Sequence, residues 1–207
     1  MTVPVVVKLG GSYAASAERD KWLDAIDGCG GRVVLVPGGG PFADAVRAAQ
    51  GEMRFDDRAA HHMALLAMEQ YGRALVGLRP RWKLTPSVEE IHAVLGGGGV
   101  PVWTPASMAL AAKDLPCSWE LTSDSLAAWL AGILGASRLL LVKRIAGSQP
   151  CVSAAGLAAA GVVDPLFPRF LGASSATAYI AGPADHAAAA AAAIRGGSVP
   201  GSRIALP

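Results

Sequence analysis

A lysine, two glycines and a serine stand near the start of the chain, directly after a run of apolar residues. Val5-Val6-Val7 leads into Lys8, and Gly10, Gly11 and Ser12 follow. Glycines let backbone N–H groups approach an anion closely, and a lysine at the end of a strand adds a full positive charge. The pattern predicts a loop that binds nucleotide phosphates, in which Lys8 neutralises charge on a transferring phosphoryl group.

A second glycine loop follows the second apolar run of the chain. Residues 33–36 are apolar, and Gly38, Gly39 and Gly40 come shortly after them. Three glycines at the start of a helix form an anion site, because free N–H groups and the helix dipole both favour negative charge. An ordinary turn or a flexible connector would account for either loop alone. The occurrence of both loops favours one polyphosphate held between them.

Composition excludes several classes of function. Hydrophobic residues make up 52% of the 207 residues, and the formal net charge is only +2, so neither nucleic acid nor an anionic membrane is expected as a partner. Three widely spaced cysteines fit no metal-binding spacing, and their odd number predicts a reduced, cytoplasmic protein. The N-terminus lacks a secretory pattern, and the alanine-rich tract 186–194 is too short to span a bilayer.

Segments of strand character alternate with segments of helical character along the chain. This alternation predicts an α/β fold in residues 1–207, a single domain with a mostly parallel sheet flanked by helices on both faces. Ligands of such sheets bind at the carboxyl ends of the strands, where Lys8, Gly38 and Lys143 fall. The expected strands are 3–8, 32–36, 75–78, 100–103, 138–143 and 204–206, and the expected helices are 17–28, 56–71, 89–95, 122–134 and 183–195, with one more beginning beyond 41.

Both glycine loops and three later segments resemble the amino acid kinase family, which includes acetylglutamate, aspartate and uridylate kinases. The first loop is similar to the family's V-x-K-x-G-G-S, and the second to its V-x-G-G-G pattern. Residues 121–127 resemble the family's [NT]-[AS]-D-x-x-A helix start, whose aspartate, here Asp124, orients the catalytic lysine. Residues 139–147 and 200–204 resemble its nucleotide-binding strand and terminal motif, so the resemblance covers nearly the whole chain.

The resemblance implies an ATP-dependent kinase with Lys8 and Asp124 as catalytic residues. Mg²⁺ would be carried by ATP, without ligands from the protein, and a homo-oligomer is expected because relatives are commonly oligomeric. A carboxylate at a helix start is also often a simple cap or dipole partner, but the motif favours the catalytic role. The residues implied to bind the ATP phosphates are Gly10, Gly11, Ser12 and Lys143.

Residues 60–68 and 115–125 are similar to one branch of the family, the small kinases of methanofuran synthesis. Those enzymes convert an aminomethylfuran-methyl phosphate to its diphosphate, so the resemblance implies a small phosphate acceptor bound by His62, Trp119 and Thr122. Adjacent histidines point to different faces of a helix, so one of His61 and His62 is expected to be structural. Trp119 fits a core position and a ring that stacks on a flat acceptor equally well.

The chain departs from the family pattern at one turn. The usual T-D-V-x-G is K-R-I-A-G in residues 143–147, and no lysine follows Lys143. Acetylglutamate-type kinases use a late lysine on the transferring phosphate, so this role falls to Lys143, Arg144 or Arg169, or is absent. If it is absent, the chain is a nucleotide-binding relative that acts as a regulatory or storage subunit. A third alternative is a kinase of uridylate, a carboxylate or isopentenyl phosphate.

Overall fold

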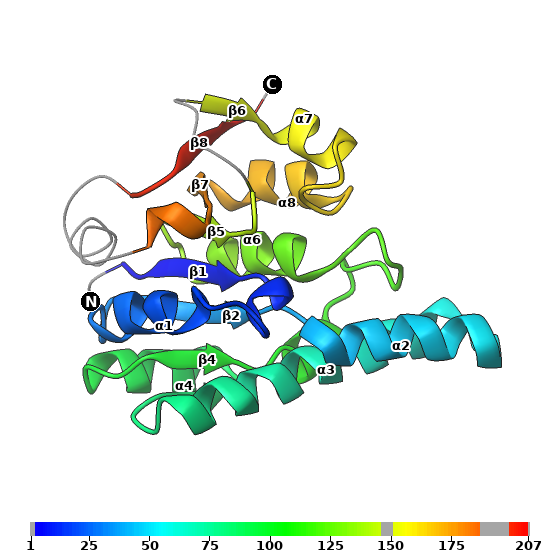
Figure 1. Cartoon of the computed structure of the whole chain (residues 1–207), viewed down its shortest axis with the longest axis horizontal. Helices are drawn as coiled ribbons and strands as arrows, with labels where there is room; N and C mark the ends of the chain where they lie inside the picture. The colour runs from blue at the N-terminus through cyan, green and yellow to red at the C-terminus, as the bar shows by residue number, and fades with distance from the viewer. Residues whose placement is uncertain (1–2, 146–150, 187–198, 207) are drawn as a thin grey trace.

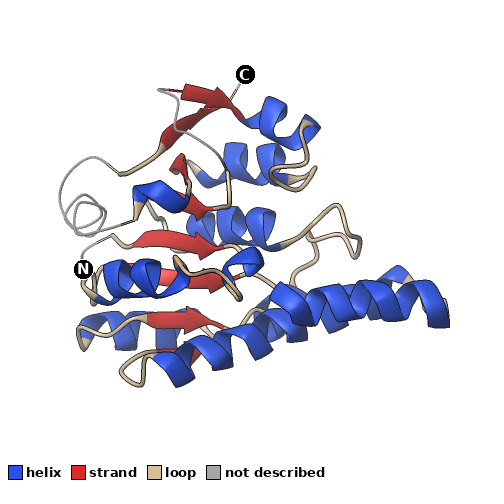
Figure 2. Cartoon of the chain, viewed as in Figure 1, coloured by secondary structure: helices blue, strands red, loops and turns tan. Residues whose placement is uncertain are grey.

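The computed structural model describes residues 3–145, 151–186 and 199–206, and its strands form one eight-stranded sheet (Figure 1). The strand order is β3-β4-β2-β1-β5-β7-β8-β6. Neighbouring strands are parallel except for β7 and β8, which are antiparallel. Helices cover the sheet on both sides (Figure 2), which confirms the predicted α/β fold with a mostly parallel sheet.

The elements have the following bounds. The strands are β1 (Val5–Leu9), β2 (Val33–Pro37), β3 (Lys83–Thr85), β4 (Pro101–Trp103), β5 (Arg138–Val142), β6 (Cys151–Ser153), β7 (Thr177–Ala181) and β8 (Ser202–Ala205). The α-helices are α1 (Arg19–Asp27), α2 (Gly40–Met53), α3 (Asp57–Leu78), α4 (Val88–Gly96), α5 (Ala106–Ala111), α6 (Ser123–Ile133), α7 (Ala154–Ala159) and α8 (Phe167–Ser174). The 3₁₀ helices are η1 (Gly11–Tyr13) and η2 (Pro183–Asp185).

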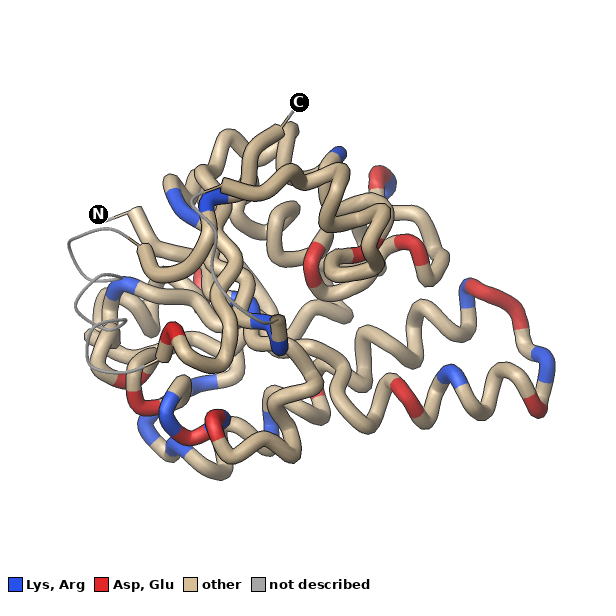
Figure 3. Tube along the Cα trace, turned by 45° about the horizontal axis from the view of Figure 1, so that its top comes forward, with Lys and Arg blue, Asp and Glu red and all other residues tan. Residues whose placement is uncertain are grey.

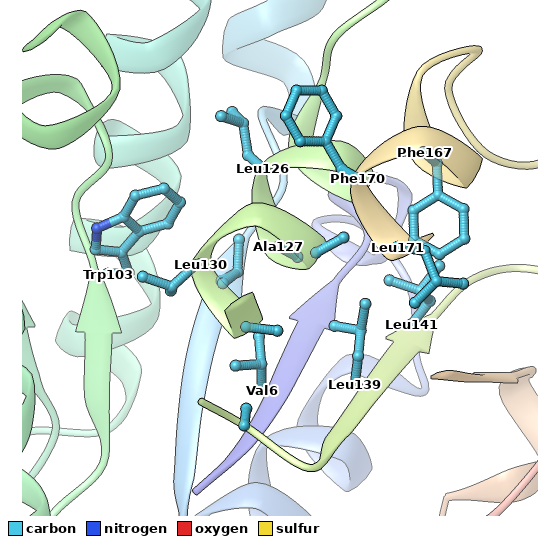
Figure 4. Packing of buried hydrophobic residues seen from close by; sticks show 14 of the residues in the cluster. Val6, Trp103, Leu126, Ala127, Leu130, Leu139, Leu141, Phe167, Phe170 and Leu171 are labelled. Atoms are coloured by element: carbon cyan, nitrogen blue, oxygen red, sulfur yellow. The ribbon is translucent and has the colours of Figure 1, made fainter. Parts of the chain in front are cut away.

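Alternate residues of the central strands face two different hydrophobic clusters. Val6 and Leu139 pack with residues of α6 and α8, whereas Val7 and Leu140 pack with residues of α1 on the other face. Figure 4 shows α6 lying across Val6 and Leu139. Because both faces are buried, these strands are apolar at nearly every position rather than at every second one, with Lys8 of β1 and Arg138 of β5 as exceptions. This explains why β1, β2 and β5 are the strands that the sequence predicts best.

Helices α2 and α3 form a hairpin that extends past the carboxyl ends of the strands (Figure 1). The predicted strand at 75–78 is wrong, because these residues form the last turn of α3. Met68, Tyr71 and Leu75 are buried at spacings of three and four residues, so the buried stripe of the helix continues through this segment. Among the described residues, none of the helices combines the length and the apolar character needed to cross a membrane.

The C-terminal third was predicted less completely. Strands β6 and β7 and helices α7 and α8 were not expected, because each has at most eight residues and a hydrophobic pattern repeats too few times in such short segments. The predicted closing strand at 204–206 is present as β8, although it runs antiparallel to β7. Of the helix expected at 183–195, the structure describes residues 183–186, which contain the 3₁₀ helix η2, and the remainder lies outside the described residues.

Candidate active site

Lys8 lies near the carboxyl end of β1, in the middle of the sheet. It pairs in register with Val36 of β2 on one side and with Leu141 of β5 on the other. Lys143 follows the last residue of β5, so its main chain emerges at the same edge. The phenol of Tyr13 in η1 donates a hydrogen bond to the Lys143 carbonyl at 3.2 Å. Parallel pairing therefore brings the two lysines to one edge of the sheet.

Asp124, in the first turn of α6, forms ion pairs with both lysines. Its Oδ1 lies 2.7 Å from Nζ of Lys8, and its Oδ2 lies 2.5 Å from Nζ of Lys143. The side chains of Lys8 and Asp124 are only 5% and 3% exposed, so solvent screens this pair very little. The buried ammonium of Lys8 and the partly buried ammonium of Lys143 thus share one carboxylate.

Burial and the neighbouring charges shift the ionisation of this group of residues. Burial lowers the pKa of the Lys8 ammonium, the attraction of Asp124 opposes this shift, and the nearby Lys143 adds to it. Burial alone would raise the pKa of Asp124, but the positive charges of Lys8 and Lys143 outweigh it, so the pKa of Asp124 is lowered. Asp124 is therefore ionised at neutral pH and does not act as a proton donor.

The two glycine loops are in direct backbone contact. The N–H of Gly38 donates to the Leu9 carbonyl at 2.9 Å, and the N–H of Gly10 donates to the Val142 carbonyl at 2.9 Å. A Cβ at Gly11 would lie 2.2 Å from the nitrogen of Gly40. No side chain fits between the loops at this point, which leaves their backbone as the lining of the space beside Lys8.

A cavity of about 460 Å³ opens beside these loops. Gly11, Ser12, Gly39 and Gly40 line one side of it, and residues of α2, α3 and the segment 118–126 line the rest. Its polar lining residues include Ser12, Arg47 and His61, and Leu65 and Met68 are among its apolar residues. A cavity of this size with a mixed polar and apolar lining is typical of small-molecule sites.

Trp119 lies in the wall of this cavity and is held on two sides. Its Nε1 donates to Oε1 of Gln50 at 2.7 Å, and the guanidinium of Arg47 lies 4.3 Å from its ring centroid. Arg47 also lines the cavity, and its guanidinium forms an ion pair there with Asp44 at 3.1 Å. The ring packs against the small cluster of Ala43, Val46 and Ala67. Trp119 is therefore a packed residue that also lines the cavity, and its contact with an acceptor stays a prediction.

The two adjacent histidines point in different directions, as expected for a helix. His61 is buried and lines the cavity, whereas His62 is exposed and lines a separate hollow beside α5. Burial lowers the pKa of His61, and the neighbouring His62 adds to this shift. His62 was predicted from the sequence to contact the acceptor, but in the structure His61 lines the cavity together with Trp119 and Thr122.

The segment that follows α7 contributes a residue that the sequence argument missed. Asp164 is buried, and its carboxylate accepts hydrogen bonds from the backbone and hydroxyl groups of Thr122 and Ser125, which flank Asp124. The Thr122 hydroxyl lies 2.8 Å from Oδ2 of Asp164, so it is already engaged. Asp164 and Pro165 form an isolated Asp-Pro pair 42 residues from Thr122, and no motif in the sequence indicates this contact.

The three residues that could take the role of the late lysine, Lys143, Arg144 and Arg169, lie in different parts of the structure. Lys143 contacts Asp124, whereas Arg169 lies over the ring of Phe170 at 5.3 Å and lines a hollow between α6 and α8. Arg144 is exposed. Lys143 is therefore the candidate that shares a carboxylate with Lys8. Figure 3 shows acidic and basic residues interspersed over the described chain, including the α2–α3 hairpin, so the positive charge near the loops is a local feature.

The site does not offer a protein ligand set for a divalent cation. In the part of the chain that the structure describes, no group of three or more His, Cys, Asp or Glu side chains is placed to hold a metal ion. Both oxygens of Asp124 face lysines.

Touching glycine loops and paired lysines at the carboxyl edge of a parallel sheet are typical of proteins that bind and transfer phosphoryl groups. Residues 4–147 match the amino acid kinase family, and the chain therefore belongs to this family. This confirms the resemblance read from the sequence. Members of the family are generally ATP-dependent phosphotransferases.

Known proteins of the family share sequence and fold with this chain. A [5-(aminomethyl)furan-3-yl]methyl phosphate kinase of Methanocaldococcus jannaschii is 23% identical over 146 residues, which span 69% of this chain and 66% of that protein. The uridylate kinase of Archaeoglobus fulgidus superposes with a TM-score of 0.71 at 18% identity, over 98% of this chain and 100% of that one. The aspartate kinase of Synechocystis superposes with a TM-score of 0.64 at 14% identity, over 98% of this chain and 40% of that one. These likenesses to solved structures show the fold alone.

Proposed function

We propose that residues 1–207 form a single kinase domain that transfers the γ-phosphoryl group of ATP to the phosphate of a small phosphorylated alcohol. The observation that carries this proposal is the pair of ion pairs from Lys8 and Lys143 to one carboxylate, that of Asp124. Two fixed cations beside a backbone-lined loop suit a transferring phosphoryl group, whose charge is spread over several oxygens.

The proposed mechanism needs positioning and charge rather than a protein nucleophile. The loops at Gly10–Gly11 and Gly38–Gly40 would hold the phosphates of donor and acceptor with their N–H groups, in line for transfer. Lys8 and Lys143 would stabilise the negative charge of the transferring group. An acceptor phosphate is already ionised near neutral pH, so no general base is required, in agreement with the engagement of Asp124 by two lysines.

Mg²⁺ is proposed as part of the donor, bound to the ATP phosphates. When bound there, it would neutralise phosphate charge alongside the two lysines. Ser12, exposed at the start of the first loop, is proposed as a further phosphate contact.

The proposed acceptor is [5-(aminomethyl)furan-3-yl]methyl phosphate, which would be converted to its diphosphate. The relative from Methanocaldococcus jannaschii supports this choice, since its name gives that substrate. The cavity supports it in size and character, because the flat ring of Trp119 and the charge of Arg47 lie in one wall. Thr122, His61 and Trp119 are proposed to contact this acceptor, and His62 less directly, through the helix turn it shares with His61.

The test is ATP turnover by the purified chain with a panel of acceptors: the aminomethylfuran phosphate, uridylate, acetylglutamate and isopentenyl phosphate. The proposal expects formation of ADP and a diphosphate product with the furan phosphate, at a kcat/KM at least tenfold above that of the others. Preference for another acceptor would retain the kinase and replace its substrate. Tight ATP binding without turnover of any acceptor would instead favour a regulatory or storage subunit. Sedimentation velocity on the same sample tests the proposed homo-oligomer.

A further inference from the structure

The start of helix α6 is held by a residue from a distant part of the chain. Thr122 is the N-cap of this helix, but its side chain makes no cap hydrogen bond to the helix backbone. Instead, Oδ2 of Asp164 accepts from the N–H of Thr122 at 3.0 Å and from the N–H of Ser125 at 3.0 Å. The carboxylate of Asp164 thus satisfies N–H groups that every helix start leaves free.

Two hydroxyl groups complete this contact. The Thr122 hydroxyl donates to Oδ2 of Asp164 at 2.8 Å, and the Ser125 hydroxyl donates to Oδ1. Four donors on both sides of Asp124 therefore converge on one buried carboxylate. Because Asp124 lies between Thr122 and Ser125 in the same helical turn, its position relative to the lysines depends on this anchor.

The same segment also contacts Lys143. The carbonyl of Val162, two residues before Asp164, accepts a hydrogen bond from Nζ of Lys143. Residues 162–164 thus hold the late lysine through a carbonyl and the start of α6 through a carboxylate. The charges are balanced as well, because Asp124 and Asp164 offset Lys8 and Lys143. Burial lowers the pKa of Lys8, and the carboxylates of Asp124 and Asp164 oppose this shift.

We propose that Asp164 is a positioning residue for phosphoryl transfer, which fixes the start of α6 and thereby places Asp124 and the two lysines. The proposal rests on the kinase function proposed above. Asp164 acts through Asp124 and is not itself in contact with the cavity. A carboxylate that merely capped α6 would affect stability, whereas a positioning residue also affects the chemical step in folded protein.

The experiment compares Asp164→Asn with wild type and with Asp114→Asn. Asparagine retains an acceptor oxygen and the shape of the side chain but loses the charge. Asp114 is a matched control, because its carboxylate accepts a hydrogen bond from Nε1 of Trp129, also in α6, at 3.1 Å and away from the lysines. The measurements are kcat, the KM for ATP and for the acceptor, the melting temperature, and amide hydrogen exchange of residues 122–125.

Asp164→Asn is expected to lower kcat by about ten- to hundredfold, as is usual for groups that orient a directly acting side chain, with each KM within about threefold. Amide hydrogen exchange of residues 122–125 should become faster. The alkaline fall in kcat/KM should move to lower pH, because one carboxylate near Lys8 is lost. Asp114→Asn should leave kcat and this exchange unchanged. If Asp164→Asn does not fold, the variant Ser125→Ala removes one of the four donors at a residue that does not line the cavity, and it is expected to lower kcat several-fold.

The outcomes separate the two proposals. An inactive wild type with every acceptor overturns the kinase function itself. An active wild type, with kcat of folded Asp164→Asn or of Ser125→Ala within twofold of it, overturns the positioning role alone. A fall in kcat that merely follows the unfolded fraction, with the alkaline fall in kcat/KM at an unchanged pH, also overturns it and leaves Asp164 as a structural cap.

Discussion

Lys143 forms its ion pair with Asp124 through Oδ2, the carboxylate oxygen that Lys8 does not use. The two lysines therefore lie on opposite oxygens of one carboxylate, with the Nζ–oxygen distances at 2.5 and 2.7 Å. A helix cap would direct these oxygens to backbone N–H groups, and at α6 this task belongs to Asp164. Asp124 is thus free to orient cations, which is the role that the motif predicted for it.

Replacing Lys8 by methionine is expected to remove turnover and leave the fold intact. Methionine fills most of the same buried volume, and Asp124 remains paired with Lys143. Loss of a positioned charge at the transferring group raises the barrier by about two to four kcal/mol, or roughly thirty- to a thousandfold in kcat. Initial rates and melting curves check this, with exposed Lys83→Met as the control. A Lys8→Met enzyme with near-normal kcat would exclude Lys8 from the chemical step.

Asp124→Asn is expected to lower both turnover and stability. The substitution leaves the buried ammonium of Lys8 and the partly buried ammonium of Lys143 without their shared counter-charge, and removal of one partner of a buried ion pair costs about 3–5 kcal/mol. Loss of a simple helix cap would cost only about 1 kcal/mol. Because ATP brings negative charge to the same lysines, it should raise the melting temperature of the variant more than that of wild type. Thermal melts with and without ATP provide the measurement, and equal ATP effects would contradict this account.

The pH dependence of kcat/KM should show a loss of activity on the alkaline side. Burial lowers the pKa of Lys8 below the 10.5 of an ordinary lysine, so its ammonium is lost below that pH and the rate falls as pH rises. The stability of the fold should change in the opposite direction. The pKa of Lys8 is lower in the folded state than in the unfolded state, so its charge costs folding free energy, and this cost diminishes as pH rises through the folded pKa. In the presence of saturating ATP, the alkaline fall in kcat should occur at a higher pH. A Lys8→Met enzyme whose residual rate retains the same alkaline fall would assign it to another group.

Gly11→Ala should weaken phosphate binding because the two glycine loops must separate. Its Cβ would lie 2.2 Å from the nitrogen of Gly40, a distance that backbone movement alone can relieve. Gly51→Ala in α2 is the matched control, since its Cβ would meet nothing within 4 Å. Alanine in a helix is favoured over glycine by roughly 0.5–1 kcal/mol, so Gly51→Ala should be slightly stabilising and retain normal ATP affinity. Calorimetric titration with ATP distinguishes the two variants, and equal affinities would show that loop contact is unimportant.

Arg47→Met is expected to raise the acceptor KM and leave the ATP KM unchanged. Methionine retains contact with the ring of Trp119 but removes the positive charge from the cavity wall. Loss of one charge-assisted contact of about 1.5–3 kcal/mol corresponds to a roughly ten- to hundredfold weaker acceptor. Steady-state kinetics with each substrate varied in turn measure this split. An increase confined to the ATP KM would place the donor, not the acceptor, in this cavity.

Sequence alone predicted the parts of the site that lie on long apolar strands. Lys8 and Lys143 follow continuous β-branched and leucine runs, and the edge at which such strands end is fixed by parallel pairing. The loops were found for the same reason, since each directly follows one of these strands. Helix α6 was found through its motif and its long apolar stretch.

Other contacts could not be inferred because they depend on tertiary packing. Asp164 reaches the start of α6 from 42 residues away, and no periodicity links the two segments. The choice between His61 and His62 depends on the rotation of α3 about its axis, which packing against the sheet decides. Strand β7 has the same length as β1, but two of its five residues are alanine, so it lacks the continuous apolar run that marked β1, β2 and β5.

Lys8 faces α6 because it is two positions from Val6, which packs on the same side of β1. Side chains alternate between the two faces of a strand, and β2 and β5 hold β1 in register on both sides. A one-residue insertion or deletion inside β1 would therefore turn the lysine away from Asp124, although the protein would still contain both residues. During evolution, changes of length should be accepted at residues 54–56, in the tip of the α2–α3 hairpin, and rejected within the five residues of β1. In β1 the number of residues before Lys8 decides which face of the sheet the lysine occupies.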